Sequence, residues 1–573
     1  MLRFVACCCL FLAPAGSLLA QNAREPAQVP DFGGQPTGAA YATGVEDGYA
    51  VAAHTYPDTP GVTVAFLDER GEPWSQPVVR YSDPNCIGLC PTIMVIEEIV
   101  FVCWIERVTN GSVQVDALYY DVTEENGEVW RGPEQMAGDP TMASESVLDF
   151  AVTRGADQNG RSYIYVLALL EVQGAPNDEL VLFAANAEGG PFSPPVHVPD
   201  RMPQAADVDQ IALSASPGRI HVAWTDDRAA TAPANDLYYR SLLAGTPNFA
   251  PEQRLTLHSQ VFDGDLLLAA ERDRVAAAWL ATLPSANQIL RAIASDDGGS
   301  TFGAAQIVGG YAPPGDDVDD PSLAVGRTDR SAMLAWSDDR TGQDMVYAAA
   351  LAQGSSQWSA DSLVFDRPAS RPTVAPSNLP GGPVLATAVA PDGYFGFFSF
   401  DQTRSWTSAF PLAPMDLGFE SLVSLAHDSR YNDFTISWLA LAGGQLHQYV
   451  GGVRPQTLNI DGAISQGAPA SFEVIYFPTY EAGLAFQVLI SGGYGTLRLP
   501  GDGRYVGLRN DILFRSFLLR PELRGVLDST GAGRTQPIQI PLPAGTRLYL
   551  VAVSGNAAGF GSITDVLQTT VGP

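Results

Sequence analysis

Two stretches of the chain carry the same cluster of charged side chains. Asp226-Asp227-Arg228 and Asp338-Asp339-Arg340 each follow an apolar run that ends in Ala-Trp and one further residue. Carboxylates beside a guanidinium offer acceptors and donors that can bind a glycan or the polar surface of a protein. We therefore take these six residues as candidate binding residues and assign no catalytic residue.

A second acidic set precedes the strands that we expect to be innermost in three of the repeats described below. Its members are Asp207, Asp209, Asp263, Asp265, Asp317 and Asp319. Clustered carboxylates suit a hard cation such as Ca²⁺, which takes several oxygen ligands. Asp also favours turns, and each Asp-Asp-Arg tip can simply pair with its neighbours. A calcium site and a purely structural role therefore both remain open.

The charge balance narrows the range of partners. All 32 basic residues are arginine and 63 residues are acidic, so the net charge is −31. The absence of lysine excludes Schiff-base chemistry. The net charge argues against binding nucleic acid or an anionic membrane surface. We expect a monomer whose partner is a glycan or an extracellular protein.

The N-terminal residues 1–20 read as a secretory signal peptide, with one arginine, a short apolar run and a small residue at Ala20. The sequence thus predicts a secreted protein with bacterial-type export and no membrane span. The mature chain keeps Cys86, Cys90 and Cys103, which permit one disulfide, Cys86–Cys90 or Cys90–Cys103, and leave one free thiol.

The elements that position the charged clusters come from an internal repeat. The centre of each apolar, Ala-Trp-type strand recurs eight times at steps of 51 to 63 residues, at Val51, Cys103, Val166, Ala223, Ala278, Ala335, Ala386 and Ser437. An aromatic residue before a further short strand recurs at a similar step, at Trp74, Trp130, Phe192, Phe249, Phe302, Trp358 and Trp406. Four-stranded units of this length, repeated radially, are typical of β-propeller blades.

The sequence therefore predicts an all-β chain with a propeller of about eight four-stranded blades over residues 39–453, with seven as the alternative count. The eighth unit lacks its outer strand. We expect the segment 21–38, around Phe32, to supply that strand and close the ring. The recurring Trp and Phe residues are interpreted as packing between blades. Residues 454–573 lack the repeat and predict a C-terminal β-sandwich.

One turn motif resembles that of a known family. Ser295, Asp297, Gly299, Thr301 and Phe302 match the Asp-box of sialidases and of the wider BNR-repeat propellers. The resemblance implies a sialidase-like propeller fold in which this motif is structural and lies between the third and fourth strands of a blade. The sialidase catalytic set is not matched, because no Arg-Ile-Pro occurs.

In a propeller, the loop before the innermost strand and the loop between the second and third strands lie at the same face. Both acidic sets should therefore meet at the mouth of the central channel. The sequence favours a secreted, non-catalytic BNR-like propeller that binds a glycan or protein through this acidic face. The alternative is a polysaccharide-active glycoside hydrolase or lyase with its site at the same mouth.

Overall fold

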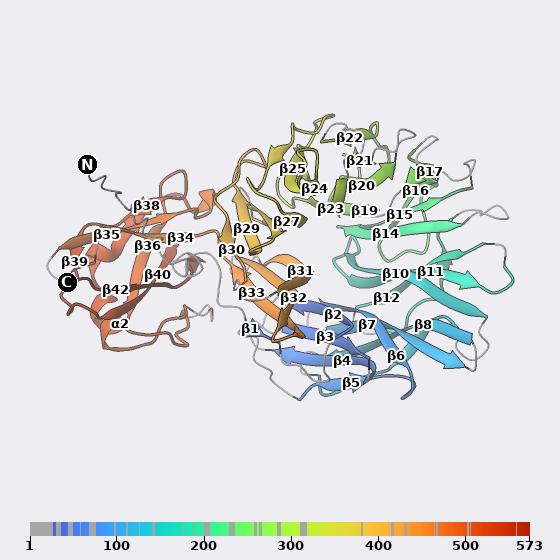
Figure 1. The fold of residues 1–573 in the computed structure, drawn as a ribbon, viewed down its shortest axis with the longest axis horizontal. Coiled ribbons are helices and arrows are strands. Elements are labelled where there is room, and N and C mark those ends of the chain that lie inside the picture. The colour runs from blue at the N-terminus through green and yellow to red at the C-terminus, as the bar shows by residue number, and fades with distance from the viewer. Residues whose placement is uncertain are drawn as a thin grey trace, which may run out of the picture.

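The computed structural model describes the chain from residue 27 to its end, apart from some connecting segments. The segments outside the described residues are 30–35, 44–49, 58, 68–75, 97–98, 111–112, 125–126, 140–143, 176, 188–189, 200–206, 229–234, 257–260, 263–265, 283–287, 310–317, 380–381, 414–417, 429–432, 463, 466–467, 501–503, 505 and 557–558. Nearly all regular structure is β-strand. Figure 1 shows sheets arranged around a centre and a separate C-terminal domain beside them.

The first four sheets of the ring are antiparallel and follow one another along the chain. Sheet 1 contains β2 (Gly38–Thr43), β3 (Ala50–Tyr56), β4 (Thr59–Leu67) and β5 (Val78–Arg80). Sheet 2 contains β6 (Ile87–Ile96), β7 (Ile99–Asn110), β8 (Val113–Glu124) and β9 (Glu134–Ala137). Sheet 3 contains β10 (Glu145–Ala156), β11 (Ser162–Val172), β12 (Glu179–Asn186) and β13 (Val196–His197). Sheet 4 contains β14 (Val208–Ser216), β15 (Arg219–Asp226), β16 (Asp236–Leu243) and β17 (Gln253–Arg254).

The next four sheets repeat this order. Sheet 5 contains β18 (Val261–Phe262), β19 (Leu267–Glu271), β20 (Arg274–Thr282), β21 (Gln288–Ser295) and β22 (Gln306–Val308). Sheet 6 contains β23 (Val318–Val325), β24 (Ala332–Asp338), β25 (Met345–Leu351) and β26 (Ser362–Leu363). Sheet 7 contains β27 (Ser370–Pro376), β28 (Val384–Ala390), β29 (Gly393–Ser399) and β30 (Phe410–Pro411). Sheet 8 contains β31 (Gly418–Asp428), β32 (Asp433–Ala442), β33 (Gln445–Val453) and β1 (Ala27–Gln28).

One strand of each sheet contacts its counterpart in the next sheet, in the order β2, β6, β10, β14, β19, β23, β27 and β31, and β31 contacts β2. This closed circuit makes the fold a β-propeller. All eight repeat positions found in the sequence lie in the second strand of a sheet, and each is fully buried. The repeat was visible in the sequence because each second strand is enclosed by sheets on both sides.

The last sheet is completed from the N-terminus. Ala27 and Gln28 pair with Val450 and Tyr449 of β33, and the backbone N–H of Val29 donates to the carbonyl of Gln448 at 2.8 Å. The Gln448 side chain also bonds the ring of His54 in sheet 1. The pairing residues therefore lie a few positions before Phe32, which is outside the described residues.

The buried tryptophans join neighbouring sheets, as predicted. Trp104, Trp224, Trp279, Trp336 and Trp438 are at most 1% exposed. Each lies in a hydrophobic cluster that includes side chains of the preceding sheet; Trp224, for example, packs with Tyr165 and Leu167. These indoles therefore hold neighbouring sheets of the ring together.

The C-terminal domain has two sheets over one shared core. One sheet contains β34 (Thr457–Asp461), β35 (Pro469–Ile475), β38 (Gly533–Arg534) and β39 (Ile538–Gln539). The other contains β36 (Ala485–Ser491), β37 (Arg524–Val526), β40 (Arg547–Asn556), β41 (Gly559–Ile563) and β42 (Leu567–Thr570). Short helices that the sequence did not predict are η1 (Thr479–Glu481), α2 (Ile512–Phe517) and η2 (Pro521–Leu523).

Two contacts attach this domain to the propeller. Arg454 lies 3.4 Å from Asp433 of sheet 8 and 3.6 Å from Asp565 of the C-terminal domain, and it is nearly buried. Phe400 of the propeller stacks on Tyr476 with ring centroids 4.3 Å apart.

Among the described helices, none is long and apolar enough to cross a membrane.

The structure corrects the predicted disulfide. Cys86, Cys90 and Cys103 are all free thiols. Cys103 lies in the core between sheets 2 and 3, whereas Cys90 is exposed on β6. Burial also raises the pKa of the Cys86 thiol to about 12, so this thiol stays protonated at neutral pH.

Candidate functional site

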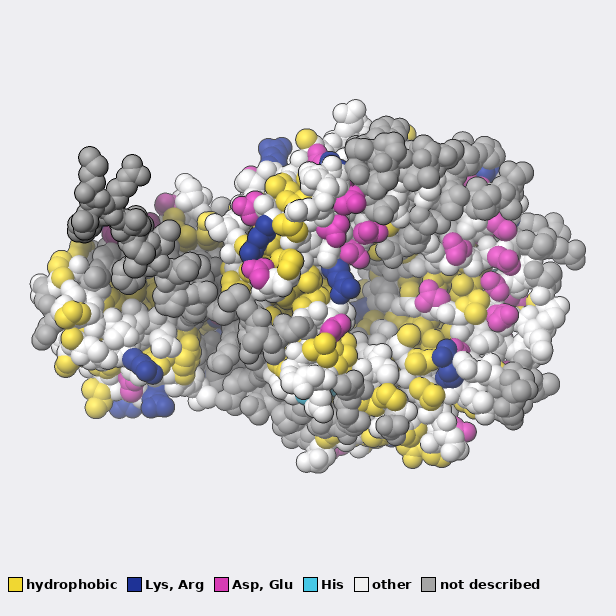
Figure 2. Space-filling view, in the orientation of Figure 1, with side chains coloured by type: hydrophobic (Ala, Val, Ile, Leu, Met, Phe, Trp, Pro, Cys, Tyr) yellow, Lys and Arg dark blue, Asp and Glu magenta, His cyan; other side chains and the backbone are white. Residues whose placement is uncertain are grey.

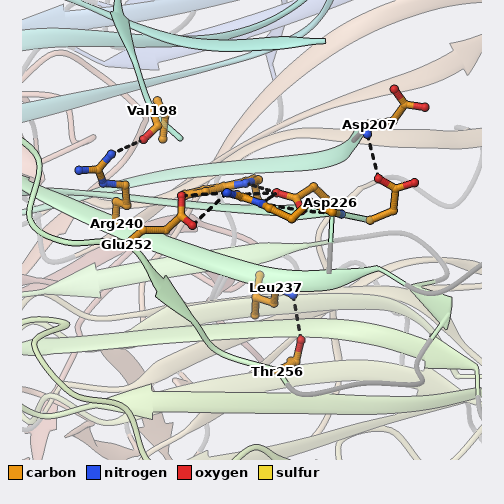
Figure 3. Close-up of polar contacts among 10 residues, drawn as sticks. Val198, Asp207, Asp226, Leu237, Arg240, Glu252 and Thr256 are labelled. Atoms are coloured by element: carbon orange, nitrogen blue, oxygen red, sulfur yellow. Dashed lines mark hydrogen bonds and ion pairs between the residues drawn. The ribbon is translucent and has the colours of Figure 1, made fainter. Parts of the chain in front are cut away.

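The Asp-Asp-Arg cluster of sheet 4 forms an internal ion-pair network. Asp226 is fully buried and accepts hydrogen bonds from Trp224 Nε1 at 2.8 Å and from Arg228 Nε at 2.9 Å. Arg228 also donates to Glu252, just before β17, at 3.0 Å (Figure 3). Its guanidinium lies over the ring of Tyr238, 4.1 Å from the centroid. Asp226 and Arg228 therefore satisfy each other and are poorly placed to bind a ligand.

Sheet 6 repeats this network with different partners. Arg340 Nη2 lies 2.6 Å from the buried carboxylate of Asp338, and Arg340 Nη1 donates to Asp361 at 2.6 Å. The guanidinium again covers a tyrosine, Tyr347, at 4.2 Å. Glu252 and Asp361 hold equivalent places before the outer strand of their sheets. The recurrence shows that the motif closes the end of a blade.

Sheet 2 has a partial copy. Buried Glu106 accepts hydrogen bonds from Trp104 Nε1 at 3.0 Å and from the Ser82 backbone N–H at 2.8 Å. Its neighbour Arg107 turns away and binds Asp116 through two hydrogen bonds of 2.8 and 2.7 Å.

The second aspartates and the predicted metal ligands lie closer to solvent. Asp227 and Asp339 are half-buried, and Asp227 accepts the backbone N–H of Asp207 at 3.0 Å (Figure 3). This contact brings the loop before β14 and the loop after β15 to one end of sheet 4. In sheet 4 the two loops therefore lie side by side, whereas the meeting of both acidic sets at the mouth of a central channel stays a prediction.

The described residues give no support to the predicted calcium site. Within them, no group of three or more His, Cys, Asp or Glu side chains is placed to hold a metal ion. Asp207 and Asp209 belong to sheet 4 and Asp319 to sheet 6, so sheet 5 separates them. Asp263, Asp265 and Asp317 lie outside the described residues. Calcium binding at this face stays a prediction.

A different set of residues faces solvent at the same end of the ring. Six of the described innermost strands carry a β-bulge near their start, where one extra residue faces the second strand. At each of these six bulges one residue is exposed, and we call these six residues the rim residues. They are Cys90, Leu148, Asp209, Asp320, Arg371 and Glu420. Bulges are common at barrel rims and beside active sites, because they redirect a side chain.

Three rim residues share an unusual backbone. Cys90, Asp320 and Arg371 have φ angles of 48°, 50° and 49°, in the left-handed region. Each directly precedes a proline that lies within the bulge. Non-glycine residues rarely adopt this conformation unless the surroundings impose it, and such residues gather at functional sites. The repeated Xaa-Pro step is a signal in the sequence that could have predicted these positions.

Rim residues of three successive sheets contact one another. The backbone N–H of Arg371 donates to the Asp320 carboxylate at 3.2 Å, and Arg371 Nη1 donates to the Glu420 carbonyl at 2.6 Å. In the view of Figure 2, acidic side chains gather around the centre of the propeller, with arginine among them. The rim can therefore offer hydrogen-bond acceptors and a guanidinium to one ligand.

Two carboxyl groups near the rim have raised pKa values. Asp149, beside the bulge of β10, reaches solvent, yet desolvation by the surrounding protein raises its pKa. At Asp178, partial burial raises the pKa first, and the charges of Asp207 and Glu171 raise it further. A carboxyl group with a raised pKa holds its proton more readily, as a general acid must.

The Asp-box lies between β21 and β22 and forms a closed turn. Ser295 Oγ donates to Asp297 at 2.7 Å, and Asp297 accepts from the backbone N–H of Thr301 at 2.8 Å. Gly299 has a φ of 81°, and a Cβ there would overlap the Tyr239 hydroxyl. The Phe302 ring packs edge-on against Tyr239, with centroids 4.8 Å apart. The motif anchors a turn and has no part in the rim.

A second turn of this type was missed in the sequence. Ser399 Oγ donates to Asp401 at 3.0 Å, and Asp401 accepts from the backbone N–H of Ser405 at 2.9 Å. Gln402 and Thr403 take φ angles of 59° and 69°, where the Asp-box has glycines. The missing glycines hid the motif, although the Ser-x-Asp spacing and the following Trp406 were present.

Comparison with known proteins gives structural similarity only. No family model matches the sequence, and neither does any curated protein. A GH93 α-L-arabinofuranosidase of Fusarium graminearum is 11% identical, with 64% of this chain and 93% of that chain covered and a TM-score of 0.34. The Trypanosoma rangeli sialidase is 10% identical, with 78% and 90% covered and a TM-score of 0.31. At these scores the fold rests on the sheet topology described above.

Proposed function

We propose that this protein is an exported, non-catalytic β-propeller of eight blades, closed by β1 and followed by a β-sandwich, that binds a glycan at its rim. The observation that carries this proposal is the set of exposed residues at bulges on the innermost strands. A bulge costs ladder hydrogen bonds, and a purely structural ring has no need of one at the same end of so many strands.

The chemistry of the rim supports a neutral or cationic glycan. Asp209, Asp320 and Glu420 are acceptors for sugar hydroxyl groups, and Arg371 supplies donors. Acidic sugars would meet a predominantly negative surface. The structurally similar arabinofuranosidase and sialidase act on sugars, and that likeness is the reason to begin with glycans.

A second candidate is a glycoside hydrolase acting at the same mouth. It is favoured by the raised pKa values of Asp149 and Asp178, because glycoside cleavage needs one protonated and one ionised carboxyl group.

A glycan-array screen on the mature protein, with and without Ca²⁺, tests the proposal. Binding followed by recovery of the glycan at its original chain length supports the binding role. Shortened products would establish the hydrolase instead and direct mutagenesis to Asp149 and Asp178. Absence of binding to any glycan would reject both. Binding that needs Ca²⁺ would support the calcium prediction.

A further inference from the structure

The C-terminal domain exposes a row of aliphatic side chains around α2. Ile512 is 81% exposed, Leu519 78% and Val526 61%. Phe514 and Phe517, on the other side of α2, are buried in the domain. Ile512 and Leu519 therefore project from the outer side of this segment. Packing within the chain does not explain why these two exposed positions carry aliphatic side chains.

Four arginines surround these side chains. Arg509 precedes α2, Arg515 lies within it, and Arg520 and Arg524 flank η2; all are exposed. Arg515 Nε donates to the side chain of Asn510 at 2.9 Å. Across the residues that the structure describes, none of the four forms an ion pair with a carboxylate. We call these arginines, with Ile512, Leu518, Leu519 and Val526, the α2 surface.

The acidic residue at the start of α2 does not neutralise this surface. Asp511 accepts hydrogen bonds from the backbone N–H groups of Phe514 and Gly492, both at 2.8 Å, and from Ser491 at 3.0 Å. It serves as the N-cap of the helix. Its lone pairs are directed into the domain. Glu522, between Arg520 and Arg524, is half-buried, and one of its carboxylate oxygens is enclosed by the protein. The fully exposed charges of this surface are therefore those of the arginines.

The charge of the whole chain is divided unequally. Residues 455–573 contain eight arginines and eight acidic residues, whereas residues 1–454 hold the other 24 arginines and 55 acidic residues. The net charge of −31 thus belongs entirely to the propeller part. Described propeller arginines that pair with carboxylates are Arg80, Arg107, Arg228, Arg254, Arg274, Arg340 and Arg367. Among the described residues, none of the four arginines of the α2 surface shares this kind of pairing.

The position of α2 separates its charge from the propeller. Figure 1 places α2 at the lower edge of the C-terminal domain, and Figure 2 shows dark blue side chains beside yellow ones there. At physiological salt, exposed charges are screened beyond about 8 Å. The net charge of the chain therefore does not prevent this surface from meeting an anionic partner.

We propose that the α2 surface docks the protein on an anionic lipid surface. Nearly fully exposed aliphatic side chains suit a deformable hydrocarbon layer, with arginines at the level of the phosphates. Protein partners instead favour aromatic and arginine anchors seated in pockets. The Arg groups supply charge complementarity, and Ile512, Leu518 and Leu519 supply apolar contact.

Vesicle flotation with the full mature chain tests this proposal. The probes are phosphatidylcholine vesicles with and without phosphatidylglycerol, at low and physiological salt. We expect binding only to the vesicles that contain phosphatidylglycerol, weakening as salt rises. Arg515→Gln with Arg520→Gln should weaken binding by roughly tenfold or more, because each arginine near the surface contributes substantially. Ile512→Ser with Leu519→Ser should weaken it similarly, without lowering the thermal unfolding temperature.

Matched control variants on the propeller test whether exposed aliphatic or arginine side chains elsewhere in the chain also affect vesicle binding. Val129→Ser with Leu363→Ser removes two other exposed aliphatic side chains, and Arg161→Gln with Arg404→Gln removes two other exposed arginines. Both control pairs should leave vesicle binding unchanged. The proposal is overturned by absence of binding to either vesicle, or by equal loss in the controls. It is also overturned if the protein does not bind vesicles but forms a concentration-dependent dimer that the α2 variants abolish. That result would show that the α2 surface binds a second copy of the chain.

Discussion

The ion-pair networks and the rim residues lie at the same end of the propeller sheets, yet they differ in almost every property. Asp226 and Arg228 are conspicuous in the sequence. In the structure Asp226 is buried, Arg228 is half-buried, and they pair with each other and with Glu252. Asp320 and Arg371 are inconspicuous in the sequence and exposed at bulges. Repetition of a motif in several blades here marks a structural need, whereas the capacity to bind lies in residues that change identity from blade to blade.

The difference has a physical basis. A buried carboxylate is tolerated only when a cation and hydrogen-bond donors satisfy it, so each network needs the same residue types in every blade that contains it. An exposed bulge residue remains solvated and places no such demand on its neighbours. Its side chain is free to vary with the ligand.

Breaking a network should give the largest effect. Asp226→Ala leaves Arg228 with Glu252 alone and deprives the Trp224 N–H of its acceptor, so we expect a loss of about 3 kcal/mol in the free energy of unfolding. Urea denaturation measures it. Asp227→Ala is the matched control, because Asp227 is half-buried. An equal loss in both variants would contradict the distinction between them.

Removing the closing strand should also destabilise the ring. Deletion of residues 21–29 removes β1, exposes the edge of β33 and frees the Gln448 carbonyl. We expect the thermal unfolding temperature to fall by several degrees. An unchanged temperature would show that the pairing of β1 contributes nothing to closure.

Changing the rim should affect binding and leave stability alone. Asp209→Asn with Asp320→Asn removes two charges from exposed positions and keeps the side-chain size. We expect glycan affinity to fall by about tenfold, as for loss of hydrogen bonds to charged groups, with the unfolding temperature unchanged. Titration calorimetry and a thermal melt on the same samples check both parts.

The smallest effect concerns pH and the two Asp-centred turns. Desolvation opposes ionisation of Asp297 and Asp401, but hydrogen bonds from Thr301 and Ser405 prevail and lower both pKa values. A carboxylate whose pKa is lowered by folding stabilises the protein above its unfolded pKa, and this contribution is lost as the pH falls through the folded value. Asp297→Asn and Asp401→Asn should each reduce the loss of stability on acidification, by little because both are exposed. Urea midpoints between about pH 6 and pH 3 would reveal it; unchanged acid dependence would contradict it.

The propeller architecture could be predicted from the sequence because a buried strand recurs at a regular spacing along the chain. Val51, Ala223 and Ser437 hold the same place in their repeats, because each second strand is covered on both faces by neighbouring sheets. Trp224 and Trp336 marked the same strand because an indole fills the space between blades. The short helix α2 escaped prediction, since its six residues are too few to establish a helical period.

The rim was harder to find because a bulge is a property of register. Whether Asp209 or its neighbour is the extra residue depends on pairing with β15, which composition does not report. The steps Cys90-Pro91, Asp320-Pro321 and Arg371-Pro372 were visible, but only the structure shows that they coincide with bulges. Asp226 and Asp338 were predicted to bind a ligand because of their charge, and the sequence does not show that both are buried.

Glycan binding by three samples tests the central claim most directly: the parent chain, the Asp209→Asn with Asp320→Asn variant, and the Asp227→Asn variant. We predict that the rim variant loses about tenfold in affinity on the best glycan of the array, while Asp227→Asn binds as the parent does. Equal binding by all three, or a loss confined to Asp227→Asn, would contradict the assignment of binding to the rim.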